Sequence, residues 1–179
     1  TAPLITYVDW HDFIPRSCGK PVKFMDVKIT SNDPETVPGE IITQGQNVML
    51  GYYKNQEATD AVIDKNGWFH TGDLATMSKD GHIFIRGRIK NMLLGANGQN
   101  VFPEEIENKL NSMTLVSECL ILQKEEKIIA LVHPDYEEAE AMGFGEEDLQ
   151  NIMEQNRGNL NEMLPSFSQI SAIQLHEEE

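Results

Sequence analysis

The sequence predicts an α+β chain in two parts: an antiparallel, β-rich part, and then a small part with two helices packed on a sheet of about three strands. Short apolar runs broken by Gly, Pro, Asn and Asp fill most of residues 19–88. Apolar residues at helical spacing follow Pro103 and Glu146. No apolar segment reaches the roughly 20 residues that a membrane span needs. We place the boundary so that the parts are residues 1–88 and 89–179.

The first part reads as strands separated by turns. Strands are predicted at residues 23–29, 40–45, 47–53, 67–77 and 82–88. A helix is predicted at 56–63, where Ala58, Ala61 and Val62 share one face. The turn SKDG, with Asp80 and Gly81, favours a hairpin between the last two strands.

The second part opens with a helix at Pro103, which suits the first helical turn. Acidic residues in its first turns favour the positive end of the helix dipole. The helix carries an apolar stripe of Ile106, Leu110 and Met113. A hairpin follows, with strands at 116–123 and 127–133 around the polar tip KEEK.

The rest of the second part is predicted to be an acidic loop, a second helix and a third strand. The helix begins near Glu146, is weakened by Gly158 and ends at Pro165. Its apolar positions are Leu149, Ile152, Met153, Leu160 and Met163. The strand is predicted at 169–175, before the acidic residues 177–179.

Charge is distributed unevenly along the chain. The net charge is −15; residues 1–103 carry 10 basic and 11 acidic side chains, whereas residues 104–179 carry 4 basic and 18 acidic ones. Such an acidic half repels phosphate backbones, which argues against nucleic-acid binding. The two cysteines, Cys18 and Cys119, give neither a disulfide framework nor a metal site, and their scarcity favours a reducing cytoplasm. The histidines have no metal-ligand spacing, and His70 reads as a packed or surface strand residue.

One block combines several short motifs in a fixed order: GWFHTGDLATMSKDGHIFIRGRIKNMLLGANGQNVFPEEIE, residues 67–107. It resembles the adenylate-forming superfamily of acyl-CoA synthetases, luciferases and peptide-synthetase adenylation domains. In that family a TGD strand precedes a GR hinge and a segment of the form V.P.EIE. The upstream segments SCGKPV and PGEIITQGQNVMLGYYKN extend the resemblance over nearly the whole chain. It implies that residues 1–88 are the end of a large adenylation domain and that residues 89–179 form most of a small mobile domain.

The resemblance implies a role in nucleotide binding for two residues. Asp73, in TGD, matches the family carboxylate that accepts hydrogen bonds from both ribose hydroxyls of ATP or AMP. Arg88, in GR, matches an arginine that reaches the ribose and the phosphates. The alternatives are that Asp73 caps a turn after Thr71 and Gly72, and that Arg88 forms only a surface salt bridge.

Two further residues are implied to serve domain motion and CoA binding. Lys90 matches the hinge about which the small domain rotates between two catalytic poses, although Asn91 stands where many relatives have an acidic residue. Gly98 matches the glycine beside the pantetheine channel of CoA; like Gly95, it lies in a loop where a missing β-carbon permits close approach or positive φ. The alternatives are a solvent-facing lysine and an ordinary turn glycine.

The resemblance also implies a reaction. The parent enzyme would use ATP and Mg²⁺ to convert a carboxylic acid into an acyl-adenylate, and CoA would then displace AMP. The motif block looks most like the long-chain fatty acid-CoA ligases, which makes a fatty acid the expected substrate but fixes no chain length. The family's phosphate loop and acyl pocket are expected upstream of residue 1 and its catalytic lysine beyond Glu179, so no catalytic residue is assigned within the chain, and the isolated fragment is expected to be inactive.

Two alternatives stay open. The acceptor could be a carrier-protein phosphopantetheine rather than CoA, or the chain could be an interaction module without chemistry. Peripheral membrane contact and the oligomeric state are also left open.

Overall fold

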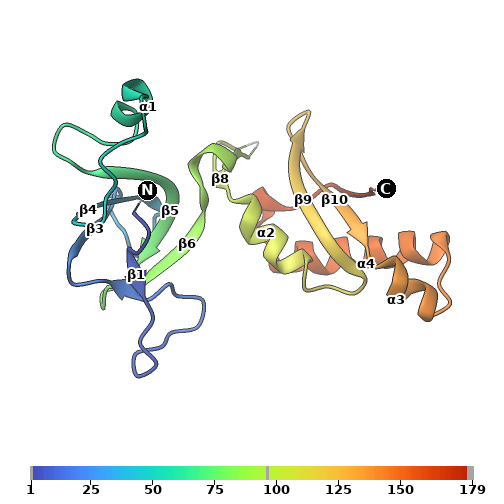
Figure 1. Ribbon diagram of the computed structural model, residues 1–179. Helices are drawn as coiled ribbons and strands as arrows, with labels where there is room; N and C mark the ends of the chain where they lie inside the picture. The colour runs from blue at the N-terminus through green and yellow to red at the C-terminus, as the bar shows by residue number, and fades with distance from the viewer. Residues whose placement is uncertain (1, 96, 177–179) are drawn as a thin grey trace. The chain divides into compact units, whose positions relative to one another are not determined.

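The computed structural model describes residues 2–95 and 97–176, so the predicted acidic end at 177–179 lies outside the described residues. The chain divides into two compact units, Thr1–Lys90 and Asn91–Glu179. The division falls two residues after the end of the predicted first part. Figure 1 shows strands dominating the first unit and longer helices in the second.

The first unit is built on a four-stranded antiparallel sheet of order β3-β4-β5-β6, accompanied by the short pair β1-β2. Its strands are β1 Thr6–Tyr7, β2 Lys20–Pro21, β3 Met25–Ile29, β4 Gly39–Gly45, β5 Phe69–Met77 and β6 Ile83–Arg88. The apolar cluster of the sheet consists of Ile29, Ile41, Ala75 and Ile83, with Val27 and Met77 packed against it. The predicted strands at 23–29, 40–45, 67–77 and 82–88 are therefore confirmed, with small shifts at their ends.

The strand predicted at 47–53 is wrong. This segment forms turns, and its one ladder contact is an isolated bridge between Tyr52 and Asn55. Leu50 is fully exposed, and Gly51 has a φ of +150°. An apolar run becomes a strand only where a neighbouring strand accepts its hydrogen bonds, and here none does so among the described residues.

The predicted helix at 56–63 is shorter and turned differently. Helix α1 spans Gln56–Asp60, and its N-cap Asn55 accepts a hydrogen bond from the Ala58 N–H group. Thr59 is its buried residue, whereas Ala61 is exposed. The Thr59 hydroxyl accepts a hydrogen bond from the Tyr52 N–H group at 2.9 Å, so a polar contact rather than the alanine face orients this helix.

The second unit has a three-stranded sheet of order β11-β10-β9, in which β9 and β10 are antiparallel and β10 and β11 are parallel. Its elements are β7 Leu93–Leu94, β8 Asn100–Val101, α2 Pro103–Leu110, β9 Val116–Lys124, β10 Lys127–Pro134, α3 Tyr136–Ala141, α4 Glu146–Met163, η2 Ser166–Ser168 and β11 Ala172–Leu175. A short 3-10 helix, η1 Ile89–Asn91, spans the division between the units.

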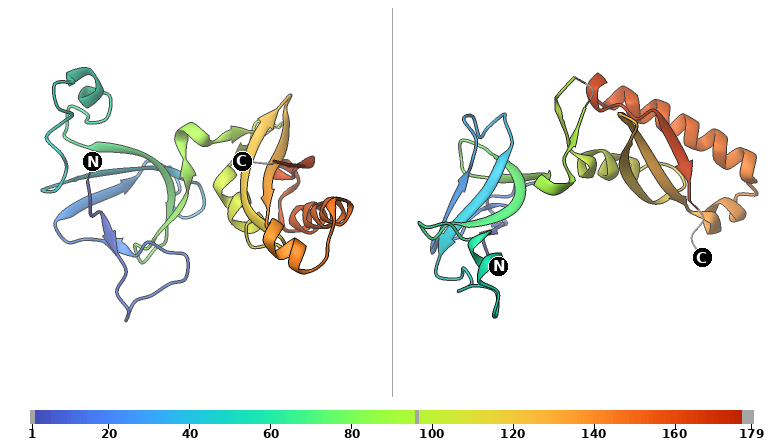
Figure 2. Two further views of the ribbon diagram at one scale, coloured as in Figure 1. Left: turned by 45° about the vertical axis from the view of Figure 1, so that its right-hand side comes forward. Right: turned by 90° about the horizontal axis from the view of Figure 1, so that it is seen from above.

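Helices α2 and α4 lie beside the sheet (Figure 2) and share one apolar core with it. Ile106 and Leu110 of α2 and Leu160 of α4 are at most 1% exposed. They pack in the same cluster as the alternate β10 residues Ile128, Ala130 and Val132, which point to one face of the sheet. The predicted hairpin and both predicted helices are therefore confirmed, although α2 ends at Leu110, before Met113 of the predicted stripe. The third strand is confirmed, but it begins at Ala172, three residues later than predicted. Gly158 is exposed within α4, and the helix continues through it.

The loop predicted before Glu146 is wrong in part, because helix α3 forms there. The Asp135 side chain caps it by accepting from the Glu138 N–H group at 2.9 Å, and Ala139 is buried. The glutamates of YEEAEA are good helix formers that need no burial, so their charge suggested a loop where a capped helix forms. Within residues 91–95 and 97–176, there is thus one α-helix more than the predicted two.

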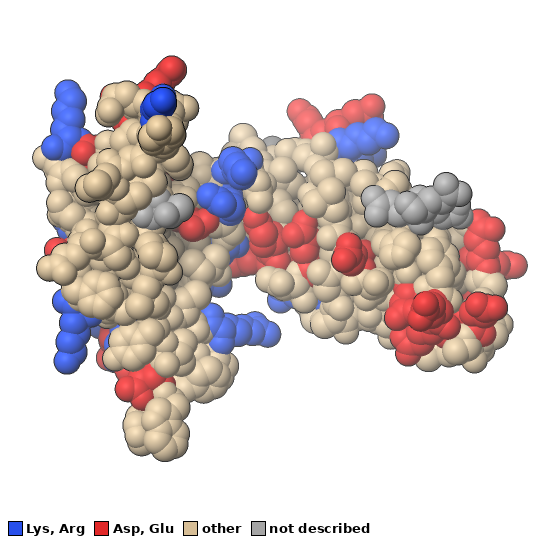
Figure 3. Space-filling model, in the orientation of Figure 1, with Lys and Arg blue, Asp and Glu red and all other residues tan. Residues whose placement is uncertain are grey.

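Acidic side chains gather on the second unit, as the sequence count indicates; on its face visible in Figure 3 they outnumber the basic ones. None of the helices among the described residues combines the length and apolar character that a membrane crossing requires.

Candidate functional site

The site begins with an irregularity in strand β5. Its pairing with β4 shifts register between Glu40 and Ile42, opposite β5 residues 71–73. Gly72 sits there with a φ of +73°, a backbone conformation that glycine adopts without steric cost. A bulge of this kind changes the direction of the residues that follow it, here Asp73.

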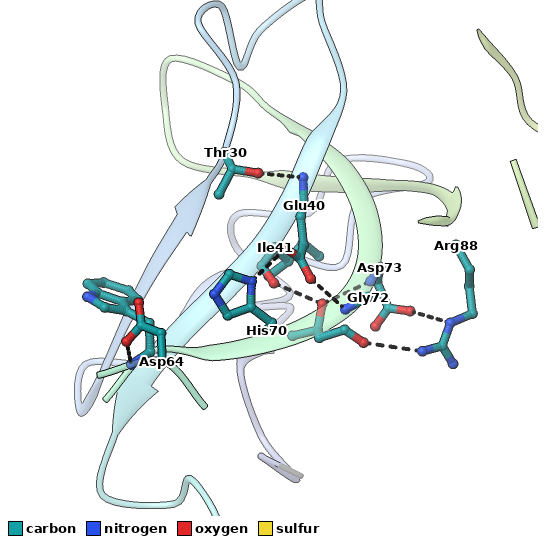
Figure 4. Close-up of polar contacts among 10 residues, drawn as sticks. Thr30, Glu40, Ile41, Asp64, His70, Gly72, Asp73 and Arg88 are labelled. Carbon is teal, nitrogen blue, oxygen red and sulfur yellow. Dashed lines mark hydrogen bonds and ion pairs between the residues drawn. The ribbon is translucent and has the colours of Figure 1, made fainter. Parts of the chain in front are cut away.

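Two side chains from the β4 and β5 strands fix this bulge (Figure 4). The Glu40 carboxylate accepts a hydrogen bond from the Gly72 N–H group at 3.0 Å, and its other oxygen lies 2.7 Å from His70 Nδ1. The Thr71 hydroxyl donates to the Ile41 carbonyl oxygen at 2.9 Å and accepts from the Asp73 N–H group at 3.0 Å. The Gly72 and Asp73 N–H groups are therefore each fixed by a side-chain acceptor, Glu40 and Thr71 respectively.

Asp73 and Arg88 face each other across the β5–β6 ladder, where they are register partners. Arg88 Nε lies 3.2 Å from Asp73 Oδ1, and Arg88 Nη2 donates to the Thr71 carbonyl oxygen at 3.2 Å. The two side chains are 38% and 48% exposed. A pair this exposed stabilises a fold by at most about 1 kcal/mol. Its charges stay accessible to a ligand.

The structure thus brings together two of the predicted site residues. The Asp73 side chain contacts Arg88, whereas the turn-cap alternative requires it to bond to the backbone. The alternative for Arg88, a surface salt bridge, is present in the structure, but its partner is Asp73 itself. A carboxylate next to a guanidinium can bind a diol and a phosphate side by side.

Lys90 lies within η1 as the last residue of the first unit, and its side chain is exposed. The next residue, Asn91, donates a hydrogen bond to Glu104 Oε1 of helix α2 at 2.7 Å. An acidic residue at position 91 would place its carboxylate next to that of Glu104, and the two would repel each other. An asparagine at this position instead donates a hydrogen bond to Glu104. The contact ties residue 91 to the second unit and leaves Lys90 outside it.

Gly98 belongs to the loop between β7 and β8 in the second unit. Its φ is +76°, and a β-carbon there would meet no atom within 4 Å. Gly95 differs: it is buried, and a β-carbon would come within 3.2 Å of the carbonyl oxygens of Gln99 and Phe167. Close approach of the backbone therefore favours glycine at position 95, and the positive φ favours it at position 98.

Sequence reasoning missed Glu40 and Thr71. The Glu40 carboxylate is separated by 30 residues or more from His70 and Gly72, which it contacts, and no motif spacing joins it to them. His70 was read as a packed or surface strand residue; it is a half-buried strand residue that pairs with Glu40. The one available signal for Thr71 was its place in TGD.

Cys18 and Cys119 are both free, so they form no disulfide with each other. Burial, with a smaller contribution from the Glu107 carboxylate, raises the pKa of the Cys119 thiol to about 12. Within residues 2–95 and 97–176, no three His, Cys, Asp or Glu side chains are grouped to hold a metal ion.

The fold of the chain is that of the adenylate-forming enzymes. It matches the anthranilate CoA ligase AuaEII, solved with anthranoyl-AMP, at a TM-score of 0.77 and 23% identity over 94% of this chain and 32% of that one. The O-succinylbenzoate CoA synthetase MenE of Bacillus subtilis matches at 0.70 and 22% identity, over 91% of this chain and 34% of that one. Likenesses at such identities show the fold.

The sequence relatives are acyl-CoA ligases. A long-chain-fatty-acid–CoA ligase of Escherichia coli is 42% identical over an alignment of 115 residues. The alignment covers 60% of this chain and 20% of that protein. A feruloyl-CoA synthase of Amycolatopsis is 40% identical over 110 residues, 59% of this chain and 22% of that protein. No protein-family model matches the chain. The chain spans about a fifth of the length of these relatives.

Proposed function

We propose that the chain is part of an ATP-dependent acid–CoA ligase that activates a fatty acid as an acyl-adenylate and transfers the acyl group to CoA. The observation that carries the proposal is the Asp73–Arg88 pair, in which Asp73 follows the β5 bulge and Arg88 lies two residues before the end of the first unit. The sequence identity with CoA ligases supports this reading over a carrier-protein acceptor or an interaction module.

Asp73 and Arg88 divide the binding of the nucleotide between them. The Asp73 carboxylate accepts hydrogen bonds from the two ribose hydroxyls, because an ionised carboxylate is an acceptor with two oxygens. Arg88 stays beside it, anchored through Nη2 on the Thr71 carbonyl, and directs its remaining N–H donors to the ribose and phosphate side.

Lys90 and Gly98 serve the second half of the reaction. Lys90 is the residue whose backbone changes conformation between acyl-adenylate formation and thioester formation, and its exposed side chain stays solvated throughout. Gly98 borders the pantetheine arm of CoA, where the absence of a side chain leaves room for it. A fatty acid is the proposed substrate because long-chain ligases are among the relatives.

The test is ATP–pyrophosphate exchange and thioester formation by the full-length protein, with fatty acids of several lengths and ferulate as acids. Asp73→Ala removes two hydrogen bonds to a charged acceptor, each worth roughly 1.5–3 kcal/mol, so both half-reactions should fall at least tenfold. Asp80→Ala, which removes an exposed carboxylate from the adjoining hairpin turn, is the matched control and should leave both unchanged. Normal exchange by Asp73→Ala would overturn the assignment.

We also propose that the 179-residue chain alone is inactive, since it spans about a fifth of the length of its relatives. Exchange above a blank by this chain would contradict that. The cytoplasmic location stays a prediction from the sequence.

A further inference from the structure

Glu40 is a largely buried acidic residue, and the proposed function gives it no role. Its side chain is 17% exposed, although an unpaired carboxylate at such a position is costly. Its two oxygens contact the Gly72 N–H group and His70 Nδ1, and its own N–H group donates to the Thr30 hydroxyl at 3.0 Å. These contacts connect β4 to β5 and to the end of β3, and the one with Gly72 is to a backbone group.

The most informative contact concerns a single peptide group, the one between Thr71 and Gly72. Its N–H donates to Glu40, and its C=O accepts from Arg88. A carboxylate and a guanidinium therefore hold opposite ends of one peptide unit, and Figure 4 shows this arrangement beside Asp73. Because Gly72 has no β-carbon, both its φ of +73° and negative φ values are sterically open to it, so these contacts help to select one orientation of this unit.

We infer that Glu40 is a positioning residue for nucleotide binding: it fixes the Thr71–Gly72 peptide and thereby the direction of Asp73 and the anchor of Arg88. The inference rests on the proposed role of Asp73. Glu40 does not touch the nucleotide in this scheme. Its effect reaches the ribose through the backbone, so its loss should mimic the loss of Asp73 and spare other features of the reaction.

The experiment measures how strongly the full-length protein prefers ATP over 3′-deoxy-ATP, as the ratio of kcat/KM in pyrophosphate exchange. ATP should be preferred by the wild type about tenfold or more, because a hydroxyl that bonds to a charged acceptor is missing from the analogue. Asp73→Ala and Glu40→Ala should both bring the ratio close to one. A variant that merely destabilises the fold lowers active enzyme for both nucleotides and leaves the ratio unchanged.

Three further variants separate the contacts of Glu40. Glu40→Gln should keep the preference, since its amide oxygen accepts from Gly72 and its amide group can donate to a neutral His70 Nδ1. His70→Ala should also keep it, because the Glu40–Gly72 hydrogen bond remains. Glu57→Ala, an exposed glutamate on α1, controls for the loss of one charge and should behave as wild type.

The outcomes distinguish this inference from the proposed function. If Asp73→Ala retains the preference, or the wild type has none, the proposed ribose contact is wrong. If Asp73→Ala loses the preference and Glu40→Ala retains it, Glu40 is not a positioning residue. Should Glu40→Ala fail to fold, Glu40→Asp decides: it keeps the charge but is one methylene too short to hold both contacts, so an unchanged ratio overturns the inference.

Discussion

The two units of the chain are stabilised differently. In the second unit, fourteen buried residues from its helices, strands and connecting loops form one apolar cluster. The corresponding cluster in the described part of the first unit has four, whereas Trp10 and Tyr53 there are 83% and 88% exposed. Among the described residues, the unit that carries the candidate site thus has the smaller apolar cluster. We therefore expect the candidate site to respond to changes in its polar and backbone contacts, and the second unit to respond to changes in packing.

The largest expected effect is on packing in the second unit. Leu160→Ala, at a residue that is fully buried, should lower the free energy of unfolding of this unit by about 2–5 kcal/mol. Both tryptophans, Trp10 and Trp68, lie in the first unit, and the long helix α4 lies in the second. Denaturation followed by far-UV circular dichroism should therefore shift, while tryptophan fluorescence should not. Leu50→Ala, at a fully exposed residue, is the control. Equal shifts in both signals would show that the units unfold together.

The next effect concerns the division between the units. Lys90→Pro fixes φ near −65°, and a pose that needs another angle is penalised by about 3 kcal/mol, roughly a hundredfold in rate. We expect the full-length protein to form acyl-adenylate normally and to lose thioester formation, as measured in single turnovers. Lys90→Ala leaves the backbone free and should keep both steps. Equal slowing of the two steps by Lys90→Pro would remove the hinge assignment.

A smaller effect compares two glycines of the first unit. Gly72 and Gly81 have φ values of +73° and +86°, so alanine at either should lower stability by about 1–2 kcal/mol. A β-carbon at Gly72 would also lie 3.3 Å from Arg88 Nη2, whereas one at Gly81 would meet nothing within 4 Å. Only Gly72→Ala should therefore raise the KM for ATP. The same KM change in Gly81→Ala would mean that strain, and not the site, is being measured.

The smallest effect is chemical and does not change stability. Because the pKa of Cys119 is raised to about 12, its thiolate is scarce at neutral pH, and iodoacetamide should modify Cys18 of the first unit first. Mass spectrometry of a time course measures the order. In denaturant the two thiols should react at similar rates. Faster labelling of Cys119 in the folded chain would mean that the second unit is packed more loosely there.

Local patterns were enough to predict most elements. Alternation and turn residues located β3 to β6, and apolar spacing located α2 and α4, because these signals depend on neighbours in the sequence. The strand predicted at 47–53 is wrong because strand formation also depends on a partner distant in the sequence. This segment has the composition of a strand, but no strand pairs with it among the described residues. Helix α3 was missed because its capping residue, Asp135, lies in an acidic run that suggested a solvated loop.

The candidate site was predictable only in part. TGD and GR pointed to Asp73 and Arg88 through family resemblance, and the β5–β6 hairpin then made them register partners. The contribution of Glu40 depends on the pairing of β4 with β5 and on a bulge, and both arise only when the chain has folded. A contact between strands 30 residues apart leaves no spacing in the sequence from which it could be read.

The parallel pairing of β10 with β11 has a consequence for how the second unit forms. Antiparallel β9 and β10 are joined by a tight hairpin, but β11 reaches β10 only after α3 and α4 have been traversed, so that Ser171 bonds to Ile128, 43 residues earlier. Closing so long a loop is slow relative to forming a hairpin or a helix. We therefore expect β11 to dock last, on a hairpin and helices already in place. During synthesis on the ribosome, the edge of β10 that pairs with β11 would stay open until Ala172–Leu175 have emerged.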